Sequence, residues 1–229
     1  MLEAVRAVAF DLDNTLWDVA PVLQRAEARL FAWLEERCPR ITARMSVEDM
    51  RRAREALAVR EPHQAHDFTY LRIAALESHA REHGYAPAIA REAFEVFLSA
   101  RCEVELFADV APALRRLRAR YPLASLSNGN ADLGRIGLRH MFSVCLHARD
   151  LGAAKPAARC FEALAQALEL PPQQILYVGD EPELDVVAAH AAGLRSAWIN
   201  RRGAPWPAHL AAPDLTVVDC LQLATALGA

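Results

Sequence analysis

The chain has 229 residues, of which 53% are hydrophobic and 24% are charged, and its net charge is −3. This composition is that of a globular chain, long enough for one large domain or for a domain and a smaller one. The absence of a basic patch argues against nucleic-acid binding, and no apolar run is long enough to span a bilayer.

The first predicted element is a short buried strand over residues 5–10, which is followed directly by Asp11 and Asp13. Two acidic residues at i and i+2 where a strand ends point beyond the sheet edge, which is where open parallel sheets bind ligands. Adjacent carboxylates repel each other, and a divalent cation is the usual way to keep such a pair ionised. The pattern therefore predicts a metal-assisted site with a carboxylate nucleophile.

Residues 21–101 have the spacing of amphipathic helices, and no strand is predicted among them. Breaks are expected near Pro39, near Pro62 and at residues 84–87. Ser46 is the expected N-cap of one of these helices, because acidic residues follow it in the first turn.

From about residue 109 strands and helices alternate, which implies a parallel sheet with helices on both faces. The predicted strands are 123–126, 143–147, 175–178, 196–200 and 216–218, and the predicted helices are 110–120, 157–170, 183–192 and 221–227. We therefore expect an α/β fold, a doubly wound Rossmann-like parallel sheet formed by residues 1–16 and 105–229. Residues 17–104 are expected to form an inserted all-helical cap domain, and such inserts often act as lids.

Polar residues follow several of these strands at turn signals, so they should gather along one edge of the sheet. They are Ser127 and Asn128, then Lys155, and finally Asp180 and Asp185. Together with the first two aspartates they supply a nucleophile, a proton donor, hydrogen-bond donors, a cation and acids for Mg²⁺. This inventory suits phosphoryl transfer.

Four segments, in order, resemble the motifs of the haloacid dehalogenase superfamily of hydrolases. They are Asp11–Thr15, Leu126–Gly129, Lys155–Pro156 and Gly179–Asp185. Their order and approximate spacing agree over nearly the whole chain, and the helical insert is similar to the family's C1-type cap of four helices. Any one of these motifs alone would be a weak signal, because a turn or a helix start would explain it.

The resemblance implies a role for each residue. Asp11 would attack phosphorus and form an aspartyl-phosphate. Asp13 would protonate the leaving oxygen and then activate water for the second step. The Ser127 hydroxyl and the Asn128 backbone N–H would hold the phosphoryl oxygens, and Lys155 would neutralise the charge on phosphate and nucleophile.

The resemblance also implies Mg²⁺ as the cofactor. Its ligands would be the side chains of Asp11 and Asp180 and the carbonyl group of Asp13, completed by water. Asp185 would bind the metal directly or through water, and it is also a candidate for orienting the lysine. Two departures from the family pattern are Asn14, where glycine is most common, and Glu181, whose metal role stays open; asparagine tolerates the left-handed turn that glycine would adopt there.

A narrower resemblance connects the chain with the bacterial branch that dephosphorylates FMN and 5-amino-6-(5-phospho-ribitylamino)uracil. It is carried by Thr15–Asp18, by the 61–67 stretch with Arg72, and by Ser127–Ala131. Candidate substrate contacts from the cap side are Trp17, His66 and Arg72. The alternatives are a core position for Trp17 and hydrogen bonds internal to the cap for His66, Asp67 and Arg72. A metal site at His63 and His66 is disfavoured, because no second ligand pair is evident.

The expected function is a Mg²⁺-dependent phosphomonoester hydrolase for a small phosphorylated metabolite, such as FMN, a riboflavin precursor or a nucleotide. A dehalogenase is one alternative, although it needs neither the acid Asp13 nor a metal at Asp180 and Asp185. A phosphomutase and a catalytically silent binding protein are the others. Five scattered cysteines and the absence of an export signal predict a cytoplasmic chain, and both a monomer and a homodimer stay open.

Overall fold

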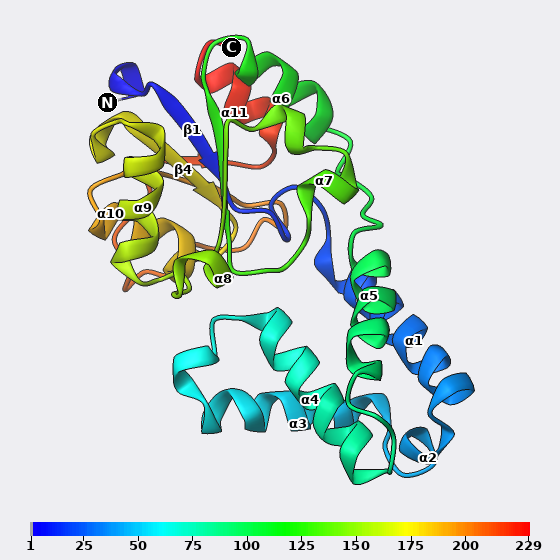
Figure 1. Ribbon diagram of the computed structural model, residues 1–229. Helices are drawn as coiled ribbons and strands as arrows, with labels where there is room; N and C mark the ends of the chain where they lie inside the picture. The colour runs from blue at the N-terminus through cyan, green and yellow to red at the C-terminus, as the bar shows by residue number, and fades with distance from the viewer. Residues whose placement is uncertain (1) are drawn as a thin grey trace. The chain divides into compact units, whose positions relative to one another are not determined.

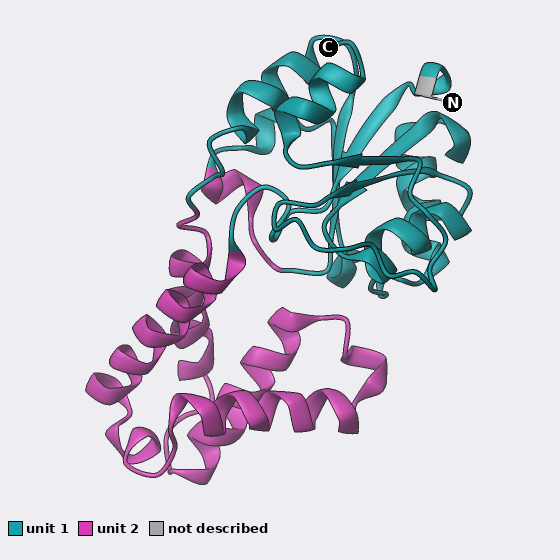
Figure 2. Cartoon of the chain, turned by 180° about the vertical axis from the view of Figure 1, so that it is seen from behind, with its two compact units in different colours: residues 1–18, 105–129, 137–229 teal, residues 19–104, 130–136 magenta. Residues whose placement is uncertain are grey.

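The computed structural model describes residues 2–229, which form two compact units (Figure 2). The first, which we call the sheet unit, contains the chain up to Asp18, then Glu105–Gly129 and Gly137–Ala229. The second, which we call the helical unit, contains Val19–Val104 and Asn130–Ile136.

The sheet unit is built on six parallel strands in the order β3-β2-β1-β4-β5-β6. The strands are β1 (Ala7–Phe10), β2 (Leu123–Ser127), β3 (Val144–His147), β4 (Ile175–Gly179), β5 (Arg195–Ile199) and β6 (Leu215–Val217). The order reverses between β1 and β4, and this switch point is where open α/β sheets bind their ligands. The predicted doubly wound α/β fold is confirmed.

Helices cover both faces of the sheet, with α6 and α11 on one face and α9 and α10 on the other (Figure 1). Side chains of β1, β2 and β4 pack against α9 and α10 in one continuous apolar core. The helical segments of this unit are η1 (Leu2–Ala4), α6 (Val110–Arg118), η3 (Arg139–Met141), α8 (Ala148–Leu151), α9 (Ala158–Leu168), η4 (Pro172–Gln174), η5 (Pro182–Val187), α10 (Ala188–Ala191) and α11 (Cys220–Ala226).

Strand β1 is buried along its whole length, because both of its faces are covered by helices. Its last residue, Phe10, lies between Ser125 of β2 and Val178 of β4. The ladder continues one residue further, since the Asp11 N–H donates to the Val178 carbonyl at 2.9 Å. Asp11 is therefore held at the carboxyl edge of the sheet by the same hydrogen bonds that hold the strand.

The helix predicted over residues 183–192 differs from the observed one in its first turns. Pro182–Val187 forms a π-helical segment, η5, and only Ala188–Ala191 is α-helical. The N–H groups of Asp185 and Val186 both donate to the Glu181 carbonyl, which widens the turn. The expected helix end is confirmed, because Gly193 follows with a φ of 83°.

The helical unit has its own apolar core, formed mainly by α1 and α5. Its segments are α1 (Val19–Arg37), α2 (Pro39–Thr42), α3 (Val47–Arg60), η2 (Pro62–Gln64), α4 (Phe68–Glu82), α5 (Ile89–Arg101) and α7 (Leu133–Ile136). Ser46 caps α3 as predicted, and Asp49 completes a capping box. The sequence did not indicate that α7 would pack with this unit, to which an Arg135–Glu95 ion pair of 2.9 Å ties it.

A buried charge cluster lies inside the helical unit. Arg72 donates to both carboxylate oxygens of Glu27, at 2.9 and 3.1 Å, and Arg54 donates to the same group at 2.7 Å. The Arg72 guanidinium also lies 3.4 Å from the centre of the Phe97 ring. Only 9% of the Arg72 side chain is exposed, so its charge depends on Glu27 for compensation.

Replacing Glu27 with alanine is expected to destabilise the protein by about 3 kcal/mol, because two largely buried guanidinium groups lose their carboxylate. Glu55→Ala is the matched control in the same unit, since Glu55 pairs with Arg51 at the surface, and no measurable change is expected there. Urea unfolding of both variants measures the difference. If Glu27→Ala unfolds at the same urea concentration as Glu55→Ala, the ion pairs of Glu27 with Arg54 and Arg72 contribute nothing to stability.

Candidate active site

The loop after β1 carries the first two candidate residues, Asp11 and Asp13. Asn14 has a φ of 60°, the left-handed conformation expected of an asparagine where glycine is most common. Its N–H donates to the Trp17 carbonyl at 2.7 Å and closes the loop. Burial is the main cause of the raised pKa of Asp11, and the charge of the nearby Asp13 adds a smaller contribution.

Lys155 is the centre of the site. Its ammonium donates to Asp11 Oδ1 at 2.6 Å, to Asp185 Oδ1 at 2.6 Å and to the Tyr177 hydroxyl at 2.8 Å. The Tyr177 hydroxyl in turn donates to the Leu126 carbonyl, so its oxygen is free to accept from the lysine. Burial alone would lower the pKa of Lys155, but Asp11 and Asp185 outweigh it and hold this pKa well above its usual value. The ammonium therefore stays charged.

Asn128, at the end of β2, fixes the backbone of this lysine. Its side-chain oxygen accepts from the Lys155 N–H at 2.8 Å, and its side-chain nitrogen donates to the Lys155 carbonyl at 3.0 Å. The adjacent Ser127 is buried, and its hydroxyl oxygen accepts from the Gly129 N–H at 3.0 Å. The hydroxyl keeps its own proton for donation to a ligand.

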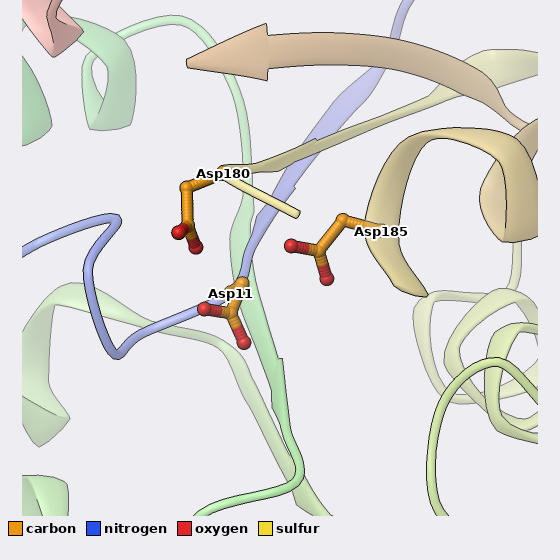
Figure 3. A group of neighbouring side chains, drawn as sticks. All are labelled: Asp11, Asp180 and Asp185. Atoms are coloured by element: carbon orange, nitrogen blue, oxygen red, sulfur yellow. The ribbon is translucent and has the colours of Figure 1, made fainter. Parts of the chain in front are cut away.

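Three carboxyl groups, those of Asp11, Asp180 and Asp185, face one another at the edge of the sheet (Figure 3). They supply oxygens that lie within 4.8 Å of one another. Burial raises the pKa of Asp11 to about 8, although Lys155 opposes this, and burial with the nearby Asp185 and Glu181 charges raises that of Asp180 to about 7. One ammonium does not offset the charge of these three carboxylates when all of them are ionised.

This donor set fits a hard divalent cation. All of its ligand atoms are oxygens, which Mg²⁺ prefers, and a cation would relieve the repulsion among the carboxylates, which adds to the effect of burial on the two pKa values. The oxygens of Asp185 already accept from Lys155 and from the Glu181 N–H at 3.0 Å, so Asp11 and Asp180 are the better direct ligands. His63 and His66 belong to no such group among residues 2–229.

Gly179 makes room for Asp185. A Cβ atom at Gly179 would lie 2.2 Å from Asp185 Oδ2 and 2.3 Å from its carboxyl carbon, closer than real contacts. The glycine that ends β4 is thus required by the position of the carboxylate, which it allows to approach the strand.

Four supporting residues had no role assigned to them from the sequence. Tyr177 binds the lysine ammonium, and Trp198 donates its indole N–H to the Asp180 carbonyl at 2.9 Å. The Thr15 hydroxyl lies 3.4 Å from Asp180 Oδ1, and Arg201 holds the Thr15 carbonyl with two hydrogen bonds. For Tyr177 the sequence contained one signal, because the hydroxyl group of a tyrosine in a buried strand needs a hydrogen-bond partner.

The candidate contacts from the cap side have other surroundings in the structure. Trp17 is fully buried and donates to Asp13, which leaves no face for stacking on a substrate. Arg72 is engaged inside the helical unit, as described above, and Asp67 caps α4 by accepting from the Tyr70 N–H at 2.9 Å. His66 is half-buried. Of the alternatives, the geometry favours the core position for Trp17 and the internal contacts for Asp67 and Arg72.

Within the described residues the five cysteines are all free, and none of the helices is both long enough and apolar enough to cross a bilayer.

Replacing Gly179 with alanine is expected to displace Asp185 and to destabilise the protein by about 1–3 kcal/mol, because the added methyl group overlaps a buried carboxylate. Thermal unfolding measures the loss. Gly134→Ala is the control, because the nearest group there is the exposed Asp132 side chain, which moves easily. Similar unfolding temperatures for the two variants would contradict the requirement for glycine at 179.

Comparison with known proteins gives relatives over most of the chain. The 5-amino-6-(5-phospho-D-ribitylamino)uracil phosphatase YigB of Escherichia coli (strain K12) is 31% identical over 203 residues, which cover 87% of this chain and 85% of that protein. The phosphoserine phosphatase of Thermus thermophilus is 36% identical over 62% of this chain and 59% of its own length.

Among solved structures, a 2-haloacid dehalogenase from Pseudomonas syringae pv. Tomato DC3000 is 36% identical, with a TM-score of 0.92. The match covers 98% of this chain and 100% of that one. The sequence profile described as haloacid dehalogenase-like hydrolase matches residues 5–193. The chain therefore belongs to the haloacid dehalogenase-like hydrolase family, which includes phosphatases and dehalogenases among its relatives.

Proposed function

We propose that this hydrolase is a Mg²⁺-dependent phosphomonoesterase that acts through an aspartyl-phosphate intermediate. The observation that carries the proposal is the Lys155 ammonium, which binds one oxygen of Asp11 while Asp180 and Asp185 stand beside it. A buried carboxylate next to a fixed cation and further acids is what attack on an anionic phosphoryl group requires.

In the first step an Asp11 carboxylate oxygen forms a bond to phosphorus, and the bond from phosphorus to the leaving oxygen breaks. Asp13 gives its proton to that oxygen, so the alcohol leaves neutral. Lys155 lowers the repulsion between the nucleophile and the phosphate. The Ser127 hydroxyl and the Asn128 N–H are the proposed donors to the phosphoryl oxygens.

In the second step water attacks the phosphorus of the aspartyl-phosphate. Asp13, now ionised, takes the water proton, and the bond from phosphorus to the Asp11 oxygen breaks to release phosphate. Asp11 and Asp180, with the Asp13 carbonyl, are the proposed ligands of Mg²⁺, which when bound supplies positive charge at the phosphoryl oxygens. Asp185 is proposed to orient Lys155 and to reach the metal through water.

The proposed substrate is a small phosphorylated metabolite. The YigB relative acts on a phosphorylated ribitylaminouracil, which supports that compound and FMN as the first substrates to test, with nucleotides next. The helical unit, most of which is inserted between residues 18 and 105, is the proposed source of substrate specificity. The free cysteines support a cytoplasmic location.

A dehalogenase is the second candidate, and the similarity to the Pseudomonas syringae structure supports it. Attack of Asp11 on a carbon bearing a halogen would release a stable halide ion. That step needs no proton donor at Asp13 and no metal at Asp180, so the presence of both acids favours the phosphatase. A phosphomutase would need transfer to a second alcohol, and a silent binding protein would not need the intact set of acids.

Phosphate release from a panel of phosphomonoesters is expected to require Mg²⁺ and to fall by at least about a thousandfold in Asp11→Asn, because the amide is a poor nucleophile. The panel contains FMN, the ribitylaminouracil phosphate, nucleotides, phosphoglycolate and sugar phosphates. Halide release from 2-haloacids is measured in parallel. Halide release without phosphate release would establish the dehalogenase instead, and activity that survives in Asp11→Asn would contradict the assigned nucleophile.

Mg²⁺ binding is expected to release protons. Without metal, the pKa of Asp11 is about 8 and that of Asp180 about 7, whereas a metal ligand must be ionised. The apparent affinity for Mg²⁺ should therefore increase as the pH rises from about 6 to about 9. Calorimetric titrations in two buffers with different ionisation enthalpies measure the number of protons released, and a value of zero at neutral pH would contradict the prediction.

The same pKa values set the stability of the metal-free protein. A carboxyl group whose pKa is raised by folding favours the folded state at low pH. The stabilisation from each group is complete below pH 3.8, the ordinary pKa of an aspartate. It decreases as the pH rises above that value, and it is lost once the pH passes the pKa in the folded protein, about 7 for Asp180 and about 8 for Asp11. The unfolding temperature of the metal-free protein should fall over this window, and less steeply in Asp180→Asn.

A further inference from the structure

Trp17 lies at the end of the loop that carries Asp13, and both its side chain and its backbone contact the rest of the sheet unit. Its side chain is fully buried. Its backbone forms isolated β-bridges with Asp13 on one side and with Leu106 on the other, and the neighbouring Leu16 carbonyl accepts from the Phe107 N–H at 3.0 Å. The indole is therefore fixed relative to the loop by the packing of the sheet unit.

The indole makes one polar contact with the site. Its Nε1–H donates to Asp13 Oδ1 at 2.8 Å. An indole N–H only donates and does not titrate near neutral pH, so Oδ1 acts as the acceptor whether Asp13 is ionised or neutral. Since a carbonyl oxygen accepts a hydrogen bond better than a hydroxyl oxygen does, this contact favours Oδ2 as the oxygen that carries the proton of neutral Asp13.

We propose that Trp17 is a positioning residue for the general acid and base of this enzyme. The inference rests on the proposed phosphatase function and goes beyond it by naming the oxygen that works. In the first step the proton moves from Asp13 Oδ2 to the leaving oxygen as the bond from phosphorus to that oxygen breaks. In the second step a proton of the attacking water returns to Oδ2.

A positioning role can be distinguished from a packing role by the substrate. If Trp17 positions the acid, the loss of activity on its replacement depends on how basic the leaving group is. An alkyl phosphate releases a strongly basic alkoxide unless a proton is supplied, whereas 4-nitrophenyl phosphate releases a stable phenolate. A misaligned acid therefore slows the first ester much more than the second. The quantity to compare is kcat/KM, because it reports the steps up to phosphoryl transfer and is independent of aspartyl-phosphate hydrolysis.

The experiment measures kcat/KM of Trp17→Phe on the best alkyl phosphate of the panel and on 4-nitrophenyl phosphate. We expect a loss of about tenfold to a hundredfold for the alkyl ester and of less than about threefold for the aryl ester. Asp13→Asn should show the same selectivity with a larger loss. In the Trp17→Phe/Asp13→Asn double variant no further loss is expected, because the indole acts only through the carboxyl group.

Tyr177→Phe is the matched control. Its hydroxyl contacts Lys155, which acts on the phosphoryl group that both esters share, so equal losses are expected for the two substrates. If thermal unfolding shows that Trp17→Phe does not fold, 3-benzothienylalanine is placed at position 17 instead. This residue keeps the shape of the indole and lacks only its N–H, so the same comparison of the two esters can be made.

Equal losses of Trp17→Phe on the two esters, or losses that add in the double variant, would overturn the positioning role while leaving the phosphatase in place. A wild-type protein that hydrolyses no phosphomonoester would overturn the proposed function and this inference together.

Discussion

A single buried ammonium, that of Lys155, has to satisfy carboxylates that arrive from different parts of the chain. Asp11 comes from the end of β1 and Asp185 from the π-helical turn after β4, and both reach the lysine at 2.6 Å. In a buried site such contacts are strong when complete and costly when one partner is lost. The surrounding structure serves this arrangement, because Asn128 holds the lysine backbone and Tyr177 accepts its third N–H.

The charge balance of the site connects folding with chemistry. Burial raises the pKa values of Asp11 and Asp180, and the neighbouring carboxylates of the cluster raise them further, because one lysine compensates these charges only in part. Keeping these acids together at the sheet edge therefore lowers the stability of the folded state. Such a loss of stability is common at sites that must bind a cation and an anion together. A stabilising change of one acid to a neutral residue would remove the function that the cluster is proposed to have.

The sequence was sufficient for the fold, because alternating apolar strands and helices imply a parallel sheet whose strand ends share one edge. The meeting of Asp11, Lys155, Asp180 and Asp185 followed from that geometry. Tyr177 was missed because it lies within an apolar strand and acts only through a lysine 22 residues away. The packing of 130–136 with the helical unit was missed for a similar reason, since it depends on contacts between distant segments that no local pattern encodes.

The bridges at Trp17 have a consequence for how such a protein can change over evolution. The chain leaves the sheet unit after Asp18 and returns at Glu105, and Trp17 pairs with Leu106 at that junction. For the sheet unit, the 86 residues of Val19–Val104 thus occupy the place of a hairpin loop. Closing a longer loop adds only a small entropic cost, so inserts of different size can be exchanged at this junction while the reaction centre is inherited unchanged.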